Sequence, residues 1–82
     1  MIYRARIEVA LKPGHSDPEG ETTAKSLKEL GYPVEATKVS KAYEITLSVR
    51  SVKEASRLVD EMCRRLLANP TKDNYSFTIE EV

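Results

Sequence analysis

The sequence predicts a small α+β fold built on an antiparallel sheet, and three features indicate it. Residues 3–11 and 75–79 alternate apolar and polar side chains, which is the pattern of a strand with one buried face. Residues 52–67 repeat apolar side chains at helical spacing, which indicates an amphipathic helix. The length of 82 residues suits one domain, 1–82, since domains usually contain about 50 to 250 residues.

The first strand ends at Pro13 and Gly14, and the first helix is expected to begin at Asp17–Pro18 and to end at Gly31. Aspartate can accept hydrogen bonds from the free amides of a first helical turn, and proline fits its first position because it has no N–H. Glycine commonly ends a helix in the left-handed conformation. Gly20 weakens the first turn by about 1 kcal/mol relative to alanine, so fraying is expected there.

Residues 34–49 are expected to hold two strands. The second, at 43–49, alternates clearly, whereas the first, at 34–39, is less regular. The turn predicted between them, at 39–42, lacks the Asn-Gly or Asp-Gly pair of a strong hairpin. A single long, bent or bulged ribbon is therefore the alternative.

A second helix is expected after Ser51, which can form a capping box with Glu54. Its apolar stripe comprises residues 52, 55, 59, 62 and 66, reinforced by Leu58, Cys63 and Leu67. Asn69–Pro70 should end the helix before a last strand. The resulting order is β-α-β-β-α-β. This is the ferredoxin-like pattern, an antiparallel sheet with two helices on one face, and a dimer could join two such sheets.

The charge balance is neutral, with 13 basic and 13 acidic side chains, so no overall electrostatic attraction to nucleic acid or an anionic membrane is expected. No stretch approaches the roughly 18 apolar residues of a membrane span. One cysteine cannot form an internal disulfide, and it offers no metal cluster. These features predict a soluble cytoplasmic protein that binds neither nucleic acid nor membrane.

No residue pattern indicates catalysis in this chain. His15 is the only histidine, and its neighbours provide no apolar setting to tune its pKa, which favours an exposed loop residue over a general base. Asp17 is explained as a helix cap. Cys63 lies on the apolar side of a helix, which favours a buried, inert thiol. Residues 11–20 precede a helix but contain neither common phosphate-loop motif.

Arg4 and Arg6 lie on the polar side of the first strand, where they could bind an anion. A cross-strand ion pair with Glu44 or Glu80 is the simpler interpretation. The strand aromatics Tyr3, Tyr43, Tyr75 and Phe77 share the alternation of the apolar core residues, so base-stacking surfaces of the RNA-binding kind are not expected. The residues alone therefore predict a module with no catalytic, cofactor or metal site.

Three stretches resemble the PurS family, the small subunit of phosphoribosylformylglycinamidine synthase. They are VALKPGHSDPEG at 9–20, KAYEITL at 41–47 and LLANPTKDNYSF at 66–77. They occur in the family's order and spacing, in a chain of matching length. His15–Ser16 and Ser40 depart from the family pattern, where apolar residues and a glycine are common.

The resemblance implies a role in de novo purine biosynthesis. The full enzyme is an ATP- and glutamine-dependent ligase that converts formylglycinamide ribonucleotide to formylglycinamidine ribonucleotide. ATP and Mg²⁺ are expected in a large, PurL-like synthetase subunit, and a PurQ-like glutaminase subunit supplies its own catalytic cysteine. The PurS-like chain would have no active site. It would form a dimer or tetramer, bridge the two partners and support ammonia transfer.

The motif matches nominate docking residues, because loops held at element ends are common binding sites. They are Lys12, Pro13, Gly14, Asp17, Pro18, Gly20, Lys41, Tyr43, Asn69, Pro70 and Tyr75. A stand-alone dimeric small-molecule-sensing domain of the same topology is the alternative. A small enzyme such as an acylphosphatase is a third possibility, but the arginine-bearing phosphate loop of that family is absent.

Overall fold

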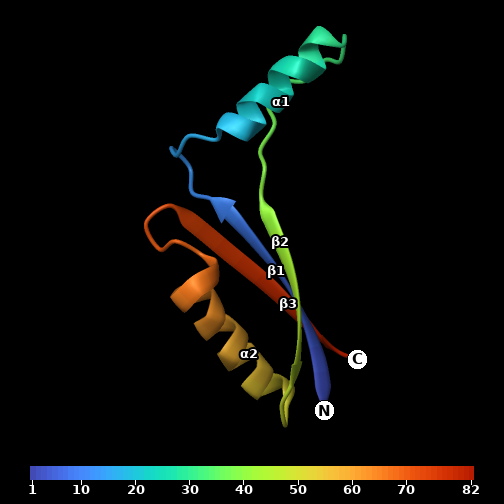
Figure 1. The fold of residues 1–82 in the computed structure, drawn as a ribbon, viewed down its shortest axis with the longest axis vertical. Helices are drawn as coiled ribbons and strands as arrows, with labels where there is room; N and C mark the ends of the chain where they lie inside the picture. Colours follow the sequence, from blue (N-terminus) through green and yellow to red (C-terminus); the bar gives the residue numbers. More distant parts are fainter.

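The fold is a three-stranded antiparallel sheet with one helix packed on it and another beyond its end (Figure 1). The computed structural model describes residues 1–82. The strands, in the spatial order β2-β1-β3, are β1 (Ile2–Leu11), β2 (Lys41–Ser48) and β3 (Asp73–Glu81). The helices are α1 (Pro18–Glu29) and α2 (Val52–Met62), and α2 continues into a π-helical turn, η1 (Cys63–Leu67). The predicted α+β class is confirmed.

The central strand β1 pairs with both neighbours, so its alternation fixes the two faces of the sheet. Ile7 lies opposite Tyr43 in β2 and Phe77 in β3, and all three side chains belong to the apolar face. On the polar face, Arg4 Nε donates to Glu80 Oε1 at 3.1 Å and lies 4.0 Å from Glu44. The predicted cross-strand ion pair of Arg4 is therefore confirmed.

Helix α2 covers the apolar face of the sheet. Its inward residues Ala55 and Val59 are fully buried, as is Cys63 in η1, against the apolar side of β1. Ser51 begins the helix as predicted, because its Oγ accepts a hydrogen bond from the Glu54 amide at 3.2 Å. The polypeptide therefore has a thin core, centred on β1 and α2.

The π-helical turn changes which leucine faces the core. The Ala68 amide donates to the Cys63 carbonyl at 2.9 Å, five positions back, so η1 is wound more loosely than an α-helix. The extra residue per turn leaves Leu66 82% exposed and places Leu67 against the core. The predicted apolar stripe was therefore wrong at Leu66 and at Val52, which is 51% exposed, and right at Leu67.

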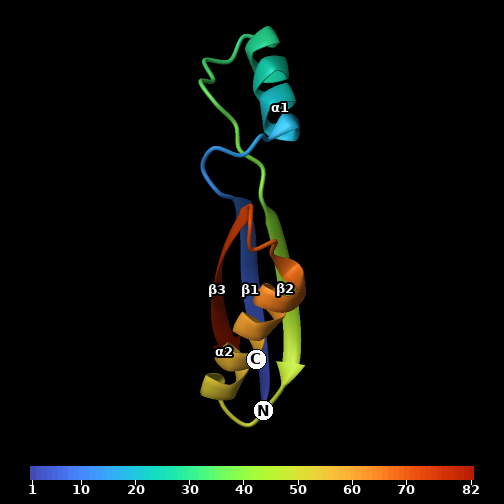
Figure 2. The ribbon, with the colours of Figure 1, turned by 90° about the vertical axis from the view of Figure 1, so that its left-hand side faces the viewer.

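Helix α1 does not lie on the sheet, which corrects the expectation of two helices on one face. Figures 1 and 2 show α1 beyond the end of β1, running beside the segment that leads back into β2. The molecule measures 51 × 28 × 13 Å as a result. Its radius of gyration is 16.3 Å, against about 12 Å for a compact domain of this length.

Residues 32–40 form no strand in this chain, so the separate strand predicted at 34–39 and the turn at 39–42 are not found. The chain instead runs directly from this segment into β2 at Lys41, as one continuous ribbon. Gly31 ends α1 as predicted, with φ of +95° and its amide bonded to the Lys28 carbonyl at 3.0 Å. We call residues 18–40, which comprise α1 and this ribbon, the α1 arm.

Candidate docking site at the end of the sheet

Three segments that are distant in sequence meet at the end of the sheet nearest the α1 arm. They are the turn after β1, the ribbon before β2 and the turn before β3. The Lys12 amide donates to the Lys72 carbonyl at 2.7 Å, and Lys12 Nζ donates to the Pro70 carbonyl at 2.9 Å. Lys12 therefore joins the first and third motif stretches directly.

The turn after β1 is shaped by Pro13 and Gly14. The His15 amide donates to the Lys12 carbonyl at 3.3 Å, which closes a four-residue turn. Gly14 has φ of +89°, and a type II turn requires a positive φ at its third position, which here directly follows Pro13. Pro13 and Gly14 are therefore explained by backbone geometry.

Asp17 links the start of α1 to the ribbon. One carboxylate oxygen accepts a hydrogen bond from the Gly20 amide and the other from the Val39 amide, each at 2.9 Å. Both bonds hold the pKa of the Asp17 carboxyl below its ordinary value, and the bond from Val39 has the larger effect. Pro18 occupies the first helical turn, as predicted. Asp17 thus caps the helix and fixes where the returning chain lies.

Gly20 permits this close approach. It is buried, and a Cβ atom at this position would collide with the Thr37 carbonyl oxygen and the Asp17 carboxylate. Backbone atoms of the ribbon therefore pass where any other residue would place its side chain. Fraying was expected at Gly20, but the structure instead shows the first turn of α1 in close contact with the ribbon.

Asn69 organises the turn before β3. Its side-chain Oδ1 accepts a hydrogen bond from the Thr71 amide at 2.9 Å, and its own amide donates to Asp73 Oδ2 at 2.8 Å. The Asn69 carbonyl also accepts from the amides of Lys72 and Asp73. These local bonds are typical of asparagine in turns. They present Pro70 at the surface beside Lys12.

A hollow of about 280 Å³ lies between the turn after β1 and the ribbon. Its lining mixes charged and apolar residues and consists of Glu8, Ala10, Leu11, Lys12, Pro13, Gly14, His15, Asp17, Lys38, Val39 and Ser40. A second hollow of about 250 Å³ is lined partly by Lys41, Val39 and Lys72. Sequence patterns did not identify Lys38 and Val39 as site residues. The weak turn signal at 39–42 was the available indication that this stretch is not an ordinary hairpin.

Two of the nominated residues, Tyr43 and Tyr75, lie elsewhere. Both pack against the core on the α2 side of the sheet. Tyr75 Oη donates to Asp60 Oδ1 at 2.6 Å, and Arg64 Nε donates to Asp60 Oδ2 at 2.8 Å. The hydrogen bond from Tyr75, and to a smaller extent that from Arg64, lowers the pKa of Asp60. The same bond to Asp60 raises the pKa of the Tyr75 hydroxyl. Tyr75 therefore fastens α2 to β3.

The titratable groups are not arranged for acid–base or nucleophilic chemistry. His15 is exposed and makes no side-chain hydrogen bond, as expected for a loop residue. Cys63 is fully buried, and burial raises the pKa of its thiol, which disfavours the reactive thiolate. No three His, Cys, Asp or Glu residues are grouped as metal ligands. No helix has the length and apolar character needed to span a membrane.

Comparison with known sequences finds one family along almost the whole chain. The sequence model of the PurS family, described as phosphoribosylformylglycinamidine (FGAM) synthase, matches residues 4–81. The synthase subunit PurS of Archaeoglobus fulgidus is 42% identical over 78 residues, which cover 94% of this chain and 98% of that protein. The corresponding Bacillus subtilis subunit is 33% identical over 82 residues, which cover 99% of this chain and 96% of that protein.

Solved structures give the same result for the fold. Thermus thermophilus PurS superimposes with a TM-score of 0.91 at 35% identity, over 100% of this chain and 99% of that one. A chain of the Thermotoga maritima PurLQS structure superimposes with a TM-score of 0.87 at 26% identity, over 100% and 99% of the two chains. The extended arrangement of the α1 arm is therefore shared with known structures.

Proposed function

This chain belongs to the PurS family, and we propose that it is the small, non-catalytic subunit of a phosphoribosylformylglycinamidine synthase of purine biosynthesis. The observation that carries the proposal is the family match over residues 4–81. The curated relatives described above are named as subunits of this synthase, and none of them supports the alternative of a stand-alone sensing domain.

The proposed partners are a PurL-like synthetase subunit and a PurQ-like glutaminase subunit, because the T. maritima relative occurs in a PurLQS structure. ATP and Mg²⁺ would bind to the synthetase subunit. The small subunit would hold the other two in the arrangement through which ammonia passes from glutaminase to synthetase. We place this work in the cytoplasm, as the sequence predicts.

We propose the end of the sheet as the docking surface for one of these partners. Lys12, Pro70 and Asp17 are held there by hydrogen bonds that join three segments, so the surface is preorganised. The adjoining hollow of about 280 Å³ combines lysine and carboxylate side chains on its walls. Such a surface suits a polar loop of another protein.

Self-association is a further part of the proposal, because the shape of the single chain leaves apolar surface uncovered. Leu30 and Tyr32, at the tip of the α1 arm, are 73% and 59% exposed. Helix α1 has no partner on its own sheet, and only 10 of 82 residues are buried. A second copy would cover these surfaces, so we expect at least a dimer. A monomer in sedimentation at high micromolar concentration would contradict this expectation.

Reconstitution tests the proposed function. Synthetase and glutaminase subunits from the same organism are assayed for product formation, with and without this chain, using either glutamine or excess ammonium chloride. We expect the glutamine-dependent rate to need this chain, and the ammonia-dependent rate of the synthetase to be largely independent of it. Equal glutamine-dependent rates in both mixtures, with no co-elution of this chain, would overturn the proposal.

A further inference from the structure

The outward face of α2 is rich in arginine. Four of the six arginines in the chain lie between residues 50 and 65. The outward side chains are those of Arg50, Lys53, Glu54, Arg57, Glu61 and Arg65, which we call the basic face of α2. It carries four cations against two carboxylates, whereas the whole chain has no net charge. Positive charge is therefore concentrated on the side of α2 that faces away from the sheet.

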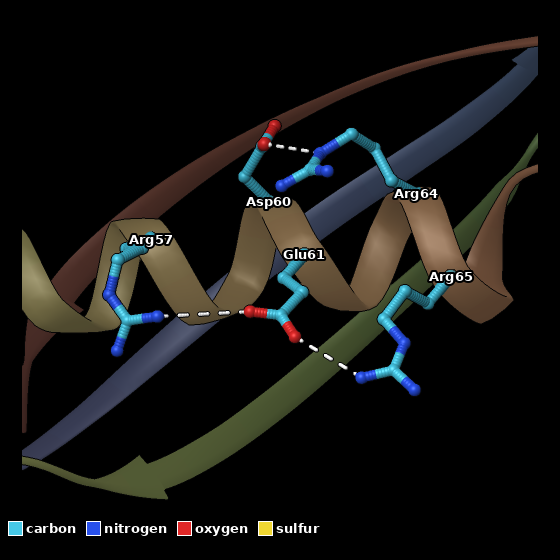
Figure 3. A network of polar contacts seen from close by, with 5 residues as sticks. All are labelled: Arg57, Asp60, Glu61, Arg64 and Arg65. Carbon is cyan, nitrogen blue, oxygen red and sulfur yellow. Dashed lines mark hydrogen bonds and ion pairs between the residues drawn. The ribbon is translucent and has the colours of Figure 1, made fainter.

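The basic face is an ordered row. Figure 3 shows Glu61 between Arg57 and Arg65, with one guanidinium directed to each of its carboxylate oxygens. The two N–O distances are 3.8 Å and 3.2 Å. Glu61 is 38% exposed in its side chain, while Arg57 and Arg65 are 65% and 77% exposed. One carboxylate thus orients two guanidinium groups and leaves most of their N–H donors facing solvent.

The neighbouring end of the face adds further unpaired cations. An open hollow beside the start of α2 is lined only by Arg50, Ser51, Lys53, Glu54 and Arg57. Neither Arg50 nor Lys53 forms an ion pair within the chain. The stability of the fold does not account for the basic face, because Arg50 and Lys53 form no pair and exposed ion pairs such as those of Glu61 contribute only about 0 to 1 kcal/mol.

From this arrangement we infer that the basic face of α2 is a docking surface for a carboxylate-rich surface of a partner subunit, which rests on the function proposed above. Arginine is enriched in protein interfaces and lysine is depleted, and guanidinium groups bind carboxylates through two parallel hydrogen bonds. The exposed cations of α1, by contrast, are Lys25 and Lys28. The arginine-rich face of α2 therefore matches the composition of protein interfaces better than the lysine-bearing face of α1 does.

The acidic members of the row favour a protein partner over a nucleic acid. Glu54 and Glu61 interrupt the cations along the helix, and a continuous phosphate backbone would meet both carboxylates. An acidic protein surface can instead place its carboxylates opposite the arginines alone. Electrostatic complementarity of this kind sets specificity and association rate, and salt weakens it.

The test measures binding of this chain to purified synthetase and glutaminase subunits, each at low and at high salt. Arg57→Glu combined with Arg65→Glu reverses two charges of the row, and Lys25→Glu combined with Lys28→Glu makes the same charge change on α1. We expect the α2 variant to bind at least one partner about tenfold or more weakly, with most of the difference lost at high salt. The α1 variant should stay within about twofold of wild type.

A milder variant guards against misfolding, since charge reversal also places like charges beside Glu61. Arg57→Lys combined with Arg65→Lys keeps the charge but removes the planar guanidinium groups. We expect it to retain the wild-type circular dichroism spectrum and to bind a partner about threefold or more weakly. Intermediate binding of this variant supports arginine–carboxylate recognition.

The outcomes separate this inference from the proposed function. If wild type binds neither subunit, the proposed function fails, and this inference fails with it. If wild type binds and all α2 variants bind within twofold of it, the basic face of α2 is overturned as a docking surface and the proposed function stands. If the α2 substitutions leave subunit binding intact but abolish binding of a single-stranded RNA oligonucleotide, the face is a nucleic-acid surface and the inference is likewise overturned.

Discussion

The carboxylate of Asp17 accepts a hydrogen bond from the amide of Val39 at 2.9 Å, across 22 positions of the sequence. The same carboxylate caps α1 through Gly20. One side chain therefore sets both the start of the helix and the path of the ribbon that returns to β2. The direction of the α1 arm depends on this pair of hydrogen bonds.

Replacing Asp17 with alanine is expected to loosen the α1 arm. The amides of Gly20 and Val39 would lose their acceptor, so their hydrogen exchange should accelerate while that of the central strand β1 stays slow. Exchange measured by NMR tests this, with Glu19→Ala in the same helical turn as the control. Unchanged exchange at Val39 in Asp17→Ala would show that the link is not important for the arm.

The same hydrogen bonds predict a pH dependence. They lower the pKa of Asp17 below its ordinary value of 3.8, so their stabilisation is complete above that pH. It is lost as the pH falls through the lower pKa of the folded state. Melting temperature should therefore fall more steeply with acid in wild type than in Asp17→Asn, in which this carboxyl is absent. Parallel acid profiles of the two proteins would refute the assignment.

Gly20→Ala is expected to destabilise the arm by about 1–3 kcal/mol, the usual cost of forcing an atom into filled space. The added Cβ would meet the Thr37 carbonyl, which belongs to the backbone and cannot rotate away. Urea denaturation measures the change, and Thr23→Ala, an exposed position of the same helix, should be neutral or slightly stabilising. A stability gain in Gly20→Ala would mean that the ribbon does not pass this closely.

The π-helical turn predicts opposite sensitivities for adjacent leucines. Leu67→Ala should lower the free energy of unfolding by about 2 kcal/mol, at the low end for leucine because the residue is only half-buried. Leu66→Ala should change it by no more than about 0.5 kcal/mol, because Leu66 is 82% exposed. Urea denaturation of both variants at one low protein concentration tests the order. The reverse order would restore the buried stripe expected from a regular α-helix.

Tyr75→Phe is expected to raise the pKa of Asp60 towards 3.8, because the Tyr75 hydroxyl is the largest cause of its lowered value. Arg64 would still hold the other oxygen, so the shift should be partial. NMR titration of the Asp60 carboxyl carbon measures this shift. Tyr43→Phe serves as the control, because Tyr43 forms no hydrogen bond with Asp60. If the Asp60 pKa is the same in Tyr75→Phe and wild type, the hydrogen bond is not formed in solution.

Most local features were predictable because each rests on a local pattern. The alternation of β1 and β3, the caps at Asp17 and Ser51 and the glycine stop at Gly31 all appear where the residues indicate them. The motif resemblance also predicted the family, which the match over 4–81 confirms. The role of the nominated docking residues stays a prediction, although most of them meet at one end of the sheet.

The features that sequence reasoning missed depend on contacts between distant segments. Residues 34–39 have strand-like character but no neighbouring strand in the single chain, and a strand needs a partner for its backbone groups. The looser winding of η1 is seen in the hydrogen bond from the Ala68 amide to the Cys63 carbonyl, which helical periodicity cannot reveal. The role of Gly20 likewise depends on a carbonyl 17 positions later, at Thr37, as the residue numbers show.

By itself, the sequence determined the fold class, the element order apart from one strand, and the family, because alternation, capping chemistry and motif spacing are written in neighbouring residues. Only the tertiary structure decided that α1 leaves the sheet, that Lys12, Asp17 and Pro70 lie at one surface, and that Arg57 and Arg65 share Glu61. The physical reason is that hydrogen bonds and close packing act over a few ångströms in space, whatever the separation along the chain.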